Sequence, residues 1–367
     1  MKYDCLVVGA GFAGCTAARL LAESGRKVLV VERLNHLAGH SHDYRNEHGI
    51  FIHSYGPHIF HTNNQEVWQF VNRFTDFHHY QHRVLSYVQG RLLPFPINLD
   101  TLNEIFDCKL KAGEARGLLR KEAAKAVYNQ PPENFRDVVV SQVGEYLYEL
   151  FFKNYTIKQW QKDPEEILPE VARRIPVREN RDDRYFTDKH QGIPASGYTN
   201  LAQELLNHDR IQFSLGRDYF DIRNNLESRL TVYTGELDRF FDYKYGRLQY
   251  RSLDFKYETL DREYFQPAAV VNYPNDHTWT RITEYKHFLG EKTRKTTISY
   301  EFPKASGEPY YVVMSGDNVE KRELYQAEVD KLKGKYLFLG RLAEYKYYNM
   351  DQVVEMVIKK IGEYLKC

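Results

Sequence analysis

Two short apolar runs flank a helical pattern at the start of the chain. Residues 5–8 and 28–31 are apolar, and small and apolar residues recur at helical spacing over residues 15–23. Apolar runs of about four residues beside such a pattern predict two buried strands joined by a helix. Gly25 ends the helical pattern, and Glu32 follows the second run. The segment is therefore predicted to form a strand–helix–strand unit.

The rest of the chain predicts three further kinds of structure. Residues 101–172 are rich in Leu, Ala, Glu, Lys and Arg, which predicts a small helical subdomain. Residues 84–93 predict two strands around a turn, which the segment 94–96 ends. Alternating segments at 229–233, 248–255, 268–273 and 296–300 predict an antiparallel sheet. A strand over 336–341 is followed by a helix, whose apolar face comprises Val353, Val354, Val357, Ile361 and Leu365.

Three glycines connect the first strand to the first helix. Gly9, Gly11 and Gly14 have G-x-G-x-x-G spacing. In a dinucleotide site the first glycine permits a tight turn, the second lets the backbone approach a pyrophosphate, and the third lets the helix lie close to the strand. The helix N-terminus attracts the phosphates, and an acid at the position of Glu32 accepts hydrogen bonds from ribose hydroxyls. These features occur in the required order, so we expect the chain to bind a dinucleotide.

The end of the chain favours FAD over NAD. Inserted segments interrupt the nucleotide-binding domain, and the closing strand, loop and helix resemble the FAD-binding fold of the glutathione-reductase type. In that fold the N-terminus of the last helix points at the flavin and stabilises its anionic reduced form. The loop around Gly39 and His40 is expected near the cofactor diphosphate. Further expected cofactor contacts are Phe12, Ala13, Arg33, His58, Ile59, Arg341, Met350 and Asp351.

The predicted fold class is α/β: an FAD-binding, Rossmann-like parallel sheet with an inserted helical subdomain and an antiparallel sheet domain. The FAD-binding domain is expected to be discontinuous, comprising residues 1–80, 195–240 and 325–367. Residues 98–180 form the helical subdomain, with a mobile loop near 165–180. Residues 81–97, 181–194 and 241–324 form the substrate domain.

Composition narrows the partners and the compartment. The 367 residues include 51 basic and 50 acidic side chains, a formal net charge of +1, which predicts no nucleic-acid or membrane partner held by bulk charge. An anionic substrate would therefore need local arginines. The four cysteines show no C-x-x-C spacing, which suits a reducing compartment. No signal peptide and no apolar stretch of about 18 residues is present, so we expect a soluble, cytoplasmic protein.

Several blocks of sequence are similar to those of one family. They are residues 55–62, 94–99, 152–160, 174–178, 191–194, 250–253, 280–284, 309–311 and 340–347. In these blocks the chain resembles the bacterial UDP-galactopyranose mutases. The resemblance implies an FAD-dependent isomerase that interconverts UDP-galactopyranose and UDP-galactofuranose by ring contraction, with N5 of reduced FAD as the nucleophile at the anomeric carbon. It also implies UDP as a ligand, NAD(P)H or a reductase as electron source, a role in cell-wall and polysaccharide biosynthesis, and a homodimer.

The same resemblance assigns the substrate residues. Arg174 and Arg281 match the two arginines that contact the diphosphate, and an arginine fork suits phosphate better than a lysine. Tyrosines expected to reach the phosphates are Tyr155, Tyr185, Tyr311 and Tyr347, with Tyr310 as an alternative to Tyr311. Trp160 is expected beside the uridine, and Phe151, Phe152, Thr156 and Asn272 around the uracil. Asn349 and Val312 depart from the family's usual acid and proline.

His58 and His61 have H-x-x-H spacing. Zinc needs three or four ligands, and no cysteine or carboxylate cluster accompanies this pair, so no metal site is predicted. We expect instead that the two histidines hydrogen-bond near the flavin N5 or the sugar.

Two other functions are compatible with a dinucleotide fold. An NAD(P)H-dependent flavin oxidoreductase would need a second nicotinamide site, but the sequence has no second glycine fingerprint. A silent nucleotide-sugar binder would bind UDP without turnover.

Overall fold

A five-stranded parallel sheet forms one half of the molecule. The computed structural model describes residues 3–173 and 175–366. The strand order is β10–β2–β1–β11–β17, and all four neighbouring pairs are parallel. The strands are β1 (Cys5–Val8), β2 (Val28–Val31), β10 (Ile211–Ser214), β11 (Leu230–Tyr233) and β17 (Tyr336–Phe338). The predicted strand–helix–strand unit is confirmed as β1, α1 (Phe12–Glu23) and β2.

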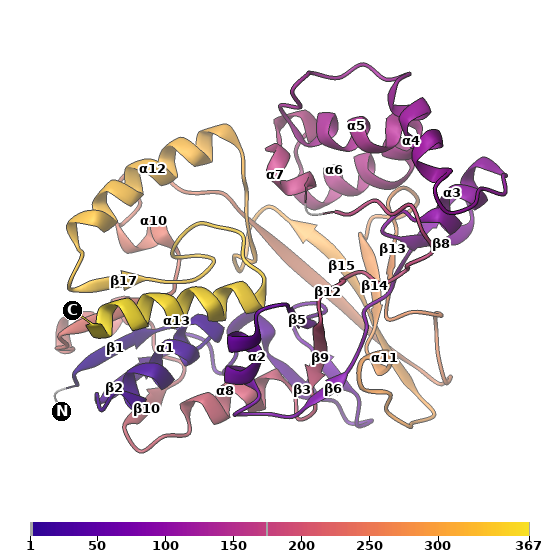
Figure 1. The fold of residues 1–367 in the computed structure, drawn as a ribbon. Helices are drawn as coiled ribbons and strands as arrows, with labels where there is room; N and C mark the ends of the chain where they lie inside the picture. Colours follow the sequence, from indigo (N-terminus) through magenta and orange to yellow (C-terminus); the bar gives the residue numbers. More distant parts are fainter. Residues whose placement is uncertain (1–2, 174, 367) are drawn as a thin grey trace.

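Helices cover both faces of this sheet (Figure 1). Successive side chains of a strand point to opposite faces, so Cys5 and Val7 of β1 join one apolar cluster while Leu6 and Val8 join another. The first face is covered by α1, which packs against α8 (Tyr198–Leu206) and α13 (Met350–Lys366). The second cluster includes Tyr325 of α12 (Gly316–Lys331), with α9 (Tyr219–Ile222) and α10 (Leu237–Phe240) beside it. Burial on both faces explains the continuous apolar runs of the sequence.

A seven-stranded sheet forms the centre of the molecule. Its strand order is β16–β12–β15–β14–β13–β7–β8. The strands are β7 (Val84–Val88), β8 (Arg91–Phe95), β12 (Tyr250–Leu260), β13 (Val270–Asn272), β14 (Arg281–Glu284), β15 (Thr296–Lys304) and β16 (Tyr311–Val312). The sheet is mixed, because β13 runs parallel to β7. The expected antiparallel pairing holds between all other neighbouring strands of this sheet, and β8 ends at Phe95, within the segment expected to end it.

One predicted strand belongs to the other sheet. Residues 229–233 alternate like their neighbours in sequence, yet β11 lies between β1 and β17 in the parallel sheet. All four residues of β11 are buried, as expected for a strand covered on both faces. Four residues are too few for alternation to distinguish a covered strand from a half-exposed one.

The helical subdomain is confirmed and lies beyond the end of the seven-stranded sheet (Figure 1). It contains α3 (Leu99–Phe106), α4 (Ala115–Ala123), α5 (Phe135–Tyr148), a π-helical turn (Glu149–Lys153), α6 (Asn154–Trp160) and α7 (Pro169–Ala172). Gly144 has a φ of +78° and interrupts α5. A Cβ there would lie 2.7 Å from a backbone carbon of Glu122, so this glycine lets α4 and α5 pack closely.

Smaller elements complete the fold. They are β3 (Asp43–Arg45) with β4 (Phe51–His53), the sheet β5 (Phe60–Thr62), β9 (His190–Pro194) and β6 (Phe77–His79), and the helices α2 (Gln65–Val71) and α11 (Lys286–Leu289). Residues 324 and 325, between which we expected a domain boundary, both lie within α12. The domain division as a whole remains a prediction. Within residues 3–173 and 175–366, no helix has the length and apolar character to cross a membrane.

Candidate functional site

A cleft opens at the carboxyl ends of β1, β2 and β11. It encloses about 1140 Å³ including its mouth, and it is lined by the glycine loop, the end of β2 and the start of α13. In open α/β sheets ligands bind at this edge of the strands. Gly11 is the N-cap of α1 and makes no side-chain cap, so the first N–H groups of the helix are available to an anion.

The glycines are required where they occur. Gly9 has a φ of +102°, and a Cβ there would lie 2.1 Å from Oγ1 of Thr234. At Gly14 a Cβ would lie 1.9 Å from the carbonyl oxygen of Gly9, so only glycine lets α1 approach β1 this closely. Gly39, with a φ of +52°, packs with its Cβ position 3.1 Å from Cα of Gly11. The cradle therefore exposes backbone rather than side chains to a pyrophosphate.

Glu32 closes the cradle at the end of β2. The residue is 6% exposed. Its Oε2 accepts a hydrogen bond from N of Ala10 at 2.7 Å, and its Oε1 accepts one from N of Leu34 at 2.8 Å. These contacts fix the carboxylate beside the glycine loop, where it can also accept hydrogen bonds from ribose hydroxyls. The glycines, the free helix N-terminus and this acid together fit a bound dinucleotide such as FAD.

The structure gathers most of the predicted cofactor residues in this cleft. Those that line it are Gly9, Gly11, Phe12, Ala13, Glu32, Arg33, Gly39, His40, His58, Arg341 and Met350. Gly14 lies behind Gly9, and Ile59 is buried away from the lining. Asp351 does not line the cleft either. Burial raises the pKa of its carboxyl, whereas the charge of neighbouring His61 and a hydrogen bond with Thr62 oppose that rise.

Sequence reasoning missed one wall of the cleft. This wall consists of residues 217–220, 234–236 and Arg239, which follow β10 and β11, together with Glu308. The signal was the Thr234-Gly235 turn after an apolar run, which repeats the strand-to-glycine pattern at Gly9. Assigning residues 229–233 to the wrong sheet concealed it.

Three polar residues form a row across the seven-stranded sheet. Asn272 of β13 stands opposite Arg281 of β14, and Arg281 stands opposite Glu301 of β15. Residues paired in this way project from the same face. Burial lowers the pKa of Arg281, but the charge of Glu301, with those of nearby tyrosines, outweighs burial and leaves that pKa raised. Arg281 is thus a permanently charged, largely enclosed cation.

Tyrosines gather around this cation. Tyr155, Tyr185 and Tyr311 all lie close enough to Arg281 to raise the pKa of its guanidinium. Burial and the charge of Glu301 raise the pKa of the Tyr311 hydroxyl and outweigh the opposing charges of Arg281 and Arg341, so the phenol stays protonated and able to donate. A cluster of one arginine and several phenol donors suits a diphosphate.

Tyr310 and Tyr311 point to different places. The Tyr311 ring stacks on that of Tyr347, with centroids 6.3 Å apart and planes 4° apart, and Trp160 meets it edge-on at 6.3 Å. The Tyr310 ring instead stacks on His40 at 4.8 Å, at the cofactor cleft. The arrangement favours Tyr311, rather than Tyr310, as the partner of Arg281.

A π-helical turn in the helical subdomain carries the predicted uracil residues. Phe151 and Phe152 lie in this turn and Thr156 follows in α6, each 3% exposed. The Phe152 ring lies 5.8 Å from that of Phe95 on β8. The wider turn shifts the following helix by a fraction of a turn, and such π-turns occur frequently at functional sites. Tyr155 follows this turn in α6, and its hydroxyl hydrogen-bonds with Arg281.

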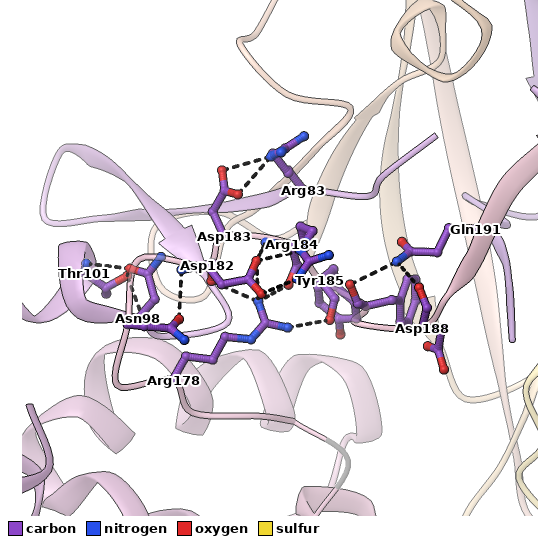
Figure 2. Close-up of polar contacts among 12 residues, drawn as sticks. Arg83, Asn98, Thr101, Arg178, Asp182, Asp183, Arg184, Tyr185, Asp188 and Gln191 are labelled. Atoms are coloured by element: carbon purple, nitrogen blue, oxygen red, sulfur yellow. Dashed lines mark hydrogen bonds and ion pairs between the residues drawn. The ribbon is translucent and has the colours of Figure 1, made fainter. Parts of the chain in front are cut away.

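A hydrogen-bonded loop holds Tyr185 (Figure 2). Nη1 of Arg178 donates to the carbonyl oxygen of Asp182 at 3.0 Å and also to that of Arg184. Nη2 of Arg178 donates to the carbonyl oxygen of Tyr185 at 3.3 Å. The Arg184 guanidinium binds both carboxylate oxygens of Asp182, at 2.9 and 2.8 Å. One buried guanidinium therefore organises the turn that presents Tyr185.

His58 lies between the cofactor cleft and the tyrosine cluster. Its Nδ1 lies 2.8 Å from the carbonyl oxygen of Gly56, which can only accept, so Nδ1 carries the hydrogen. Burial lowers its pKa to about 4; the hydrogen bond to Gly56 opposes this, and the charges of Arg341, His40 and Arg281 add to it. His58 is therefore neutral near pH 7, with Nε2 as an acceptor.

His61 has a different environment. Its Nδ1 lies 2.8 Å from Oδ2 of Asp188, and its ring stacks on Phe186 at 3.6 Å. The two histidines thus have different hydrogen-bond partners, Gly56 for His58 and Asp188 for His61, and their shared site near the flavin or the sugar stays a prediction. No cluster of three or more His, Cys, Asp or Glu that could bind a metal ion occurs in the described ranges. Arg174, the other predicted diphosphate ligand, lies outside the described residues.

Comparisons with known proteins agree with this geometry. A family model described as UDP-galactopyranose mutase matches residues 150–347, and one described as an NAD(P)-binding Rossmann-like domain matches residues 7–74. The chain is 38% identical to a probable UDP-galactopyranose mutase of Klebsiella pneumoniae, over 98% of this chain and 94% of the relative. It is also 38% identical to a dTDP-fucopyranose mutase of Escherichia coli, over 98% of each. A crystal structure of reduced UDP-galactopyranose mutase superposes with a TM-score of 0.80 at 17% identity, covering 100% of this chain and 94% of that one. The predicted fold class is confirmed.

Proposed function

The chain belongs to the UDP-galactopyranose mutase family and is an FAD-dependent enzyme of that family, and from this premise we propose that it interconverts UDP-galactopyranose and UDP-galactofuranose. The observation that carries the proposal is the position of the Arg281 cluster beside the cofactor cleft. His58 and Arg341 line the cleft. His58 also interacts electrostatically with Arg281, and Arg341 with Tyr311, so the cluster adjoins the cleft. A sugar bound next to the flavin would therefore keep its diphosphate on Arg281.

Reduced FAD, when bound, would supply the nucleophilic N5 that attacks the anomeric carbon of the sugar as UDP leaves. The side chains then have to retain the leaving nucleotide rather than react themselves. Arg281 would stabilise the charge that the departing diphosphate gains, and Tyr155, Tyr185, Tyr311 and Tyr347 would donate hydrogen bonds to its oxygens. Retention allows UDP to return to the sugar after the ring has closed through a different hydroxyl.

The remaining residues would orient the substrate. Phe151, Phe152, Thr156, Trp160 and Asn272 would enclose the uracil, where an indole edge and buried phenyl rings exclude water. His58, neutral and accepting through Nε2, would orient a sugar hydroxyl or a flavin N–H. Arg174 would complete the diphosphate site from the segment near 165–180, which we expect to close over the substrate. These roles, a homodimer and the source of electrons remain predictions.

A turnover assay tests the proposal. The FAD-bound protein is reduced with dithionite and incubated with UDP-galactofuranose, and the sugar nucleotides are separated by chromatography. We expect UDP-galactopyranose to form only in the reduced sample, without stoichiometric loss of reductant. Arg281→Gln should reduce turnover by about a hundredfold or more, a range typical for loss of an electrostatic contact in the transition state. Arg73→Gln, an exposed arginine that pairs with Glu23 and does not line the cleft, is the matched control. Absence of interconversion, with steady oxidation of NADH instead, would favour the flavin oxidoreductase.

A second candidate substrate is dTDP-fucopyranose. It is favoured by one observation: the dTDP-fucopyranose mutase of Escherichia coli is as similar to this chain as the Klebsiella relative. Both reactions exchange a six-membered for a five-membered sugar ring on a nucleoside diphosphate, so both need the same diphosphate site. Measuring kcat/KM for the two substrates on one reduced preparation decides between them, and we expect the UDP-sugar to be preferred.

A further inference from the structure

Glu301 lies directly beside Arg281 on the neighbouring strand. The two residues are paired in the register of β14 and β15, and their side chains project from the same face of the sheet. Glu301 is 2% exposed. A buried carboxylate next to the cation that meets the diphosphate works against binding by its charge alone. Its presence there therefore calls for a physical explanation.

Glu301 forms a close ion pair with Arg281, outside hydrogen-bond geometry at Nε, and accepts a hydrogen bond from Thr280. Nε of Arg281 lies 3.2 Å from its Oε1, and Thr280 Oγ1 donates to the same oxygen at 3.4 Å. The backbone carbonyl of Glu301 accepts from N of Thr280 at 2.9 Å. A Cβ on Gly56 would lie 3.3 Å from Oε2, so the second oxygen packs against the loop that leads to His58. The carboxylate is held by the sheet on one side and by this loop on the other.

Contact through Nε leaves the terminal nitrogens of the guanidinium for other partners. Tyr155 hydrogen-bonds with Arg281 and, with Tyr185 and Tyr311, comes from segments outside β14 and β15. Arginine has five N–H donors in one plane, so fixing one edge determines the direction of the other. The long Arg281 side chain would otherwise have several rotamers in which this second edge turns away.

We propose that Glu301 is a positioning residue that holds the Nε edge of Arg281 so that its terminal nitrogens face the diphosphate of the nucleotide sugar. The proposal rests on the proposed function, because the diphosphate is that of its substrate. The opposing charge of the carboxylate weakens attraction for the anion, and the fixed direction of the donors more than offsets that loss.

Binding of UDP and of uridine to the oxidised FAD-bound protein tests this role. Glu301→Gln keeps the shape of the side chain and removes its charge. We expect UDP to bind about tenfold more weakly, on the order of one lost charge-assisted hydrogen bond. Uridine, which has no diphosphate, should bind within about twofold of wild type. In the reduced enzyme the loss should be found mainly in KM for the UDP-sugar.

Two further variants separate positioning from general damage. Glu284→Gln changes a second buried carboxylate, which lies on β14. Glu284 is 0% exposed, and its Oε1 accepts a hydrogen bond from Oγ1 of Thr296 at 2.6 Å. Glu284 lies three residues from Arg281, so it projects from the opposite face of the sheet. We expect this variant to lower the melting temperature and leave UDP affinity unchanged. In an Arg281→Gln background, Glu301→Gln should cause no further loss of UDP affinity, because the group through which it acts is gone.

The outcomes are distinguishable. Equal losses for UDP and uridine, equal losses with and without Arg281, or unchanged or tighter UDP binding by Glu301→Gln would each overturn the positioning role. If instead the wild-type protein fails both to bind UDP and to turn over, the proposed function itself is refuted. If Glu301→Gln does not fold, Glu301→Asp, which keeps the charge but shortens the side chain, should show the same UDP-specific loss.

Discussion

Replacing His53 with asparagine should make the stability of this protein less sensitive to acid. His53 is 1% exposed and stacks on Phe288 with ring centroids 5.0 Å apart. Its Nδ1 accepts a hydrogen bond from N of His58 at 3.1 Å, so the hydrogen must be on Nε2, which has no partner within the described part of the chain. Burial, assisted by the charge of His58, lowers the pKa of His53 to about 3.

The sign and size of the effect follow from linkage. Between pH 6.5 and about 3 the unfolded chain binds a proton on this ring and the native protein does not. Stability is therefore lost as pH falls through this window, by up to about 1.4 kcal/mol per pH unit, or about 2 kcal/mol between pH 7.5 and pH 5. Asparagine can keep the acceptor at the Nδ1 position but cannot titrate. At pH 7.5 the variant should be less stable by about 2 kcal/mol, because the stacked ring is lost.

Urea unfolding of the FAD-bound proteins at pH 7.5 and 5.0, at one fixed free FAD concentration, measures both quantities. We expect the difference between wild type and His53→Asn to shrink from about 2 kcal/mol to near zero as pH falls. His79→Asn changes an exposed histidine of β6, in water in both states, and should run parallel to wild type. A difference that stays constant between the two pH values would refute the reasoning, since native His53 would then accept a proton freely.

Three other outcomes are expected. Gly14→Ala should abolish FAD binding, measured by flavin absorbance after gel filtration, whereas Gly117→Ala, whose added methyl would meet nothing within 4 Å, should retain it. Burial raises the pKa of Glu308, but its ion pairs outweigh burial and lower that pKa to about 2. The stabilisation from these ion pairs is therefore present above pH 4.5 and is lost toward pH 2. In urea unfolding, Glu308→Gln should be less stable than wild type by about 2 kcal/mol at pH 7, and the difference should be smaller at pH 3.5. Tyr311→Phe should raise KM for the UDP-sugar several-fold in initial-rate assays, and Tyr310→Phe should not; equal effects would contradict the assignment of Tyr311 to the diphosphate.

Local sequence patterns were sufficient to predict a structural feature where one segment of the chain forms that feature alone. The glycine loop, α1 and Glu32 lie within a short stretch, and each residue is needed for a local steric or hydrogen-bonding reason. The apolar face of α13 was readable for the same reason, since helical periodicity is a property of one segment.

Prediction from the sequence failed where the structure depends on which distant segment a strand or side chain contacts. The strand β11 has the same alternating appearance as β12, and only its pairing with β1 and β17 distinguishes it. His58 and His61 are three residues apart but have different hydrogen-bond partners, Gly56 and Asp188. Neither the choice of neighbouring strand nor the direction of a side chain after a turn is encoded in a pattern of a few residues.

The sequence by itself determined that the chain has a dinucleotide cradle, a helical insertion and a set of arginine and tyrosine blocks resembling one enzyme family. Only the tertiary structure decided how these meet: Arg281 opposite Glu301 across two strands, Tyr155 of α6 hydrogen-bonded to Arg281, and Tyr311 rather than Tyr310 turned toward the cation. The physical reason is that composition and periodicity report burial, whereas the direction of a charged group depends on contacts between segments far apart in the chain.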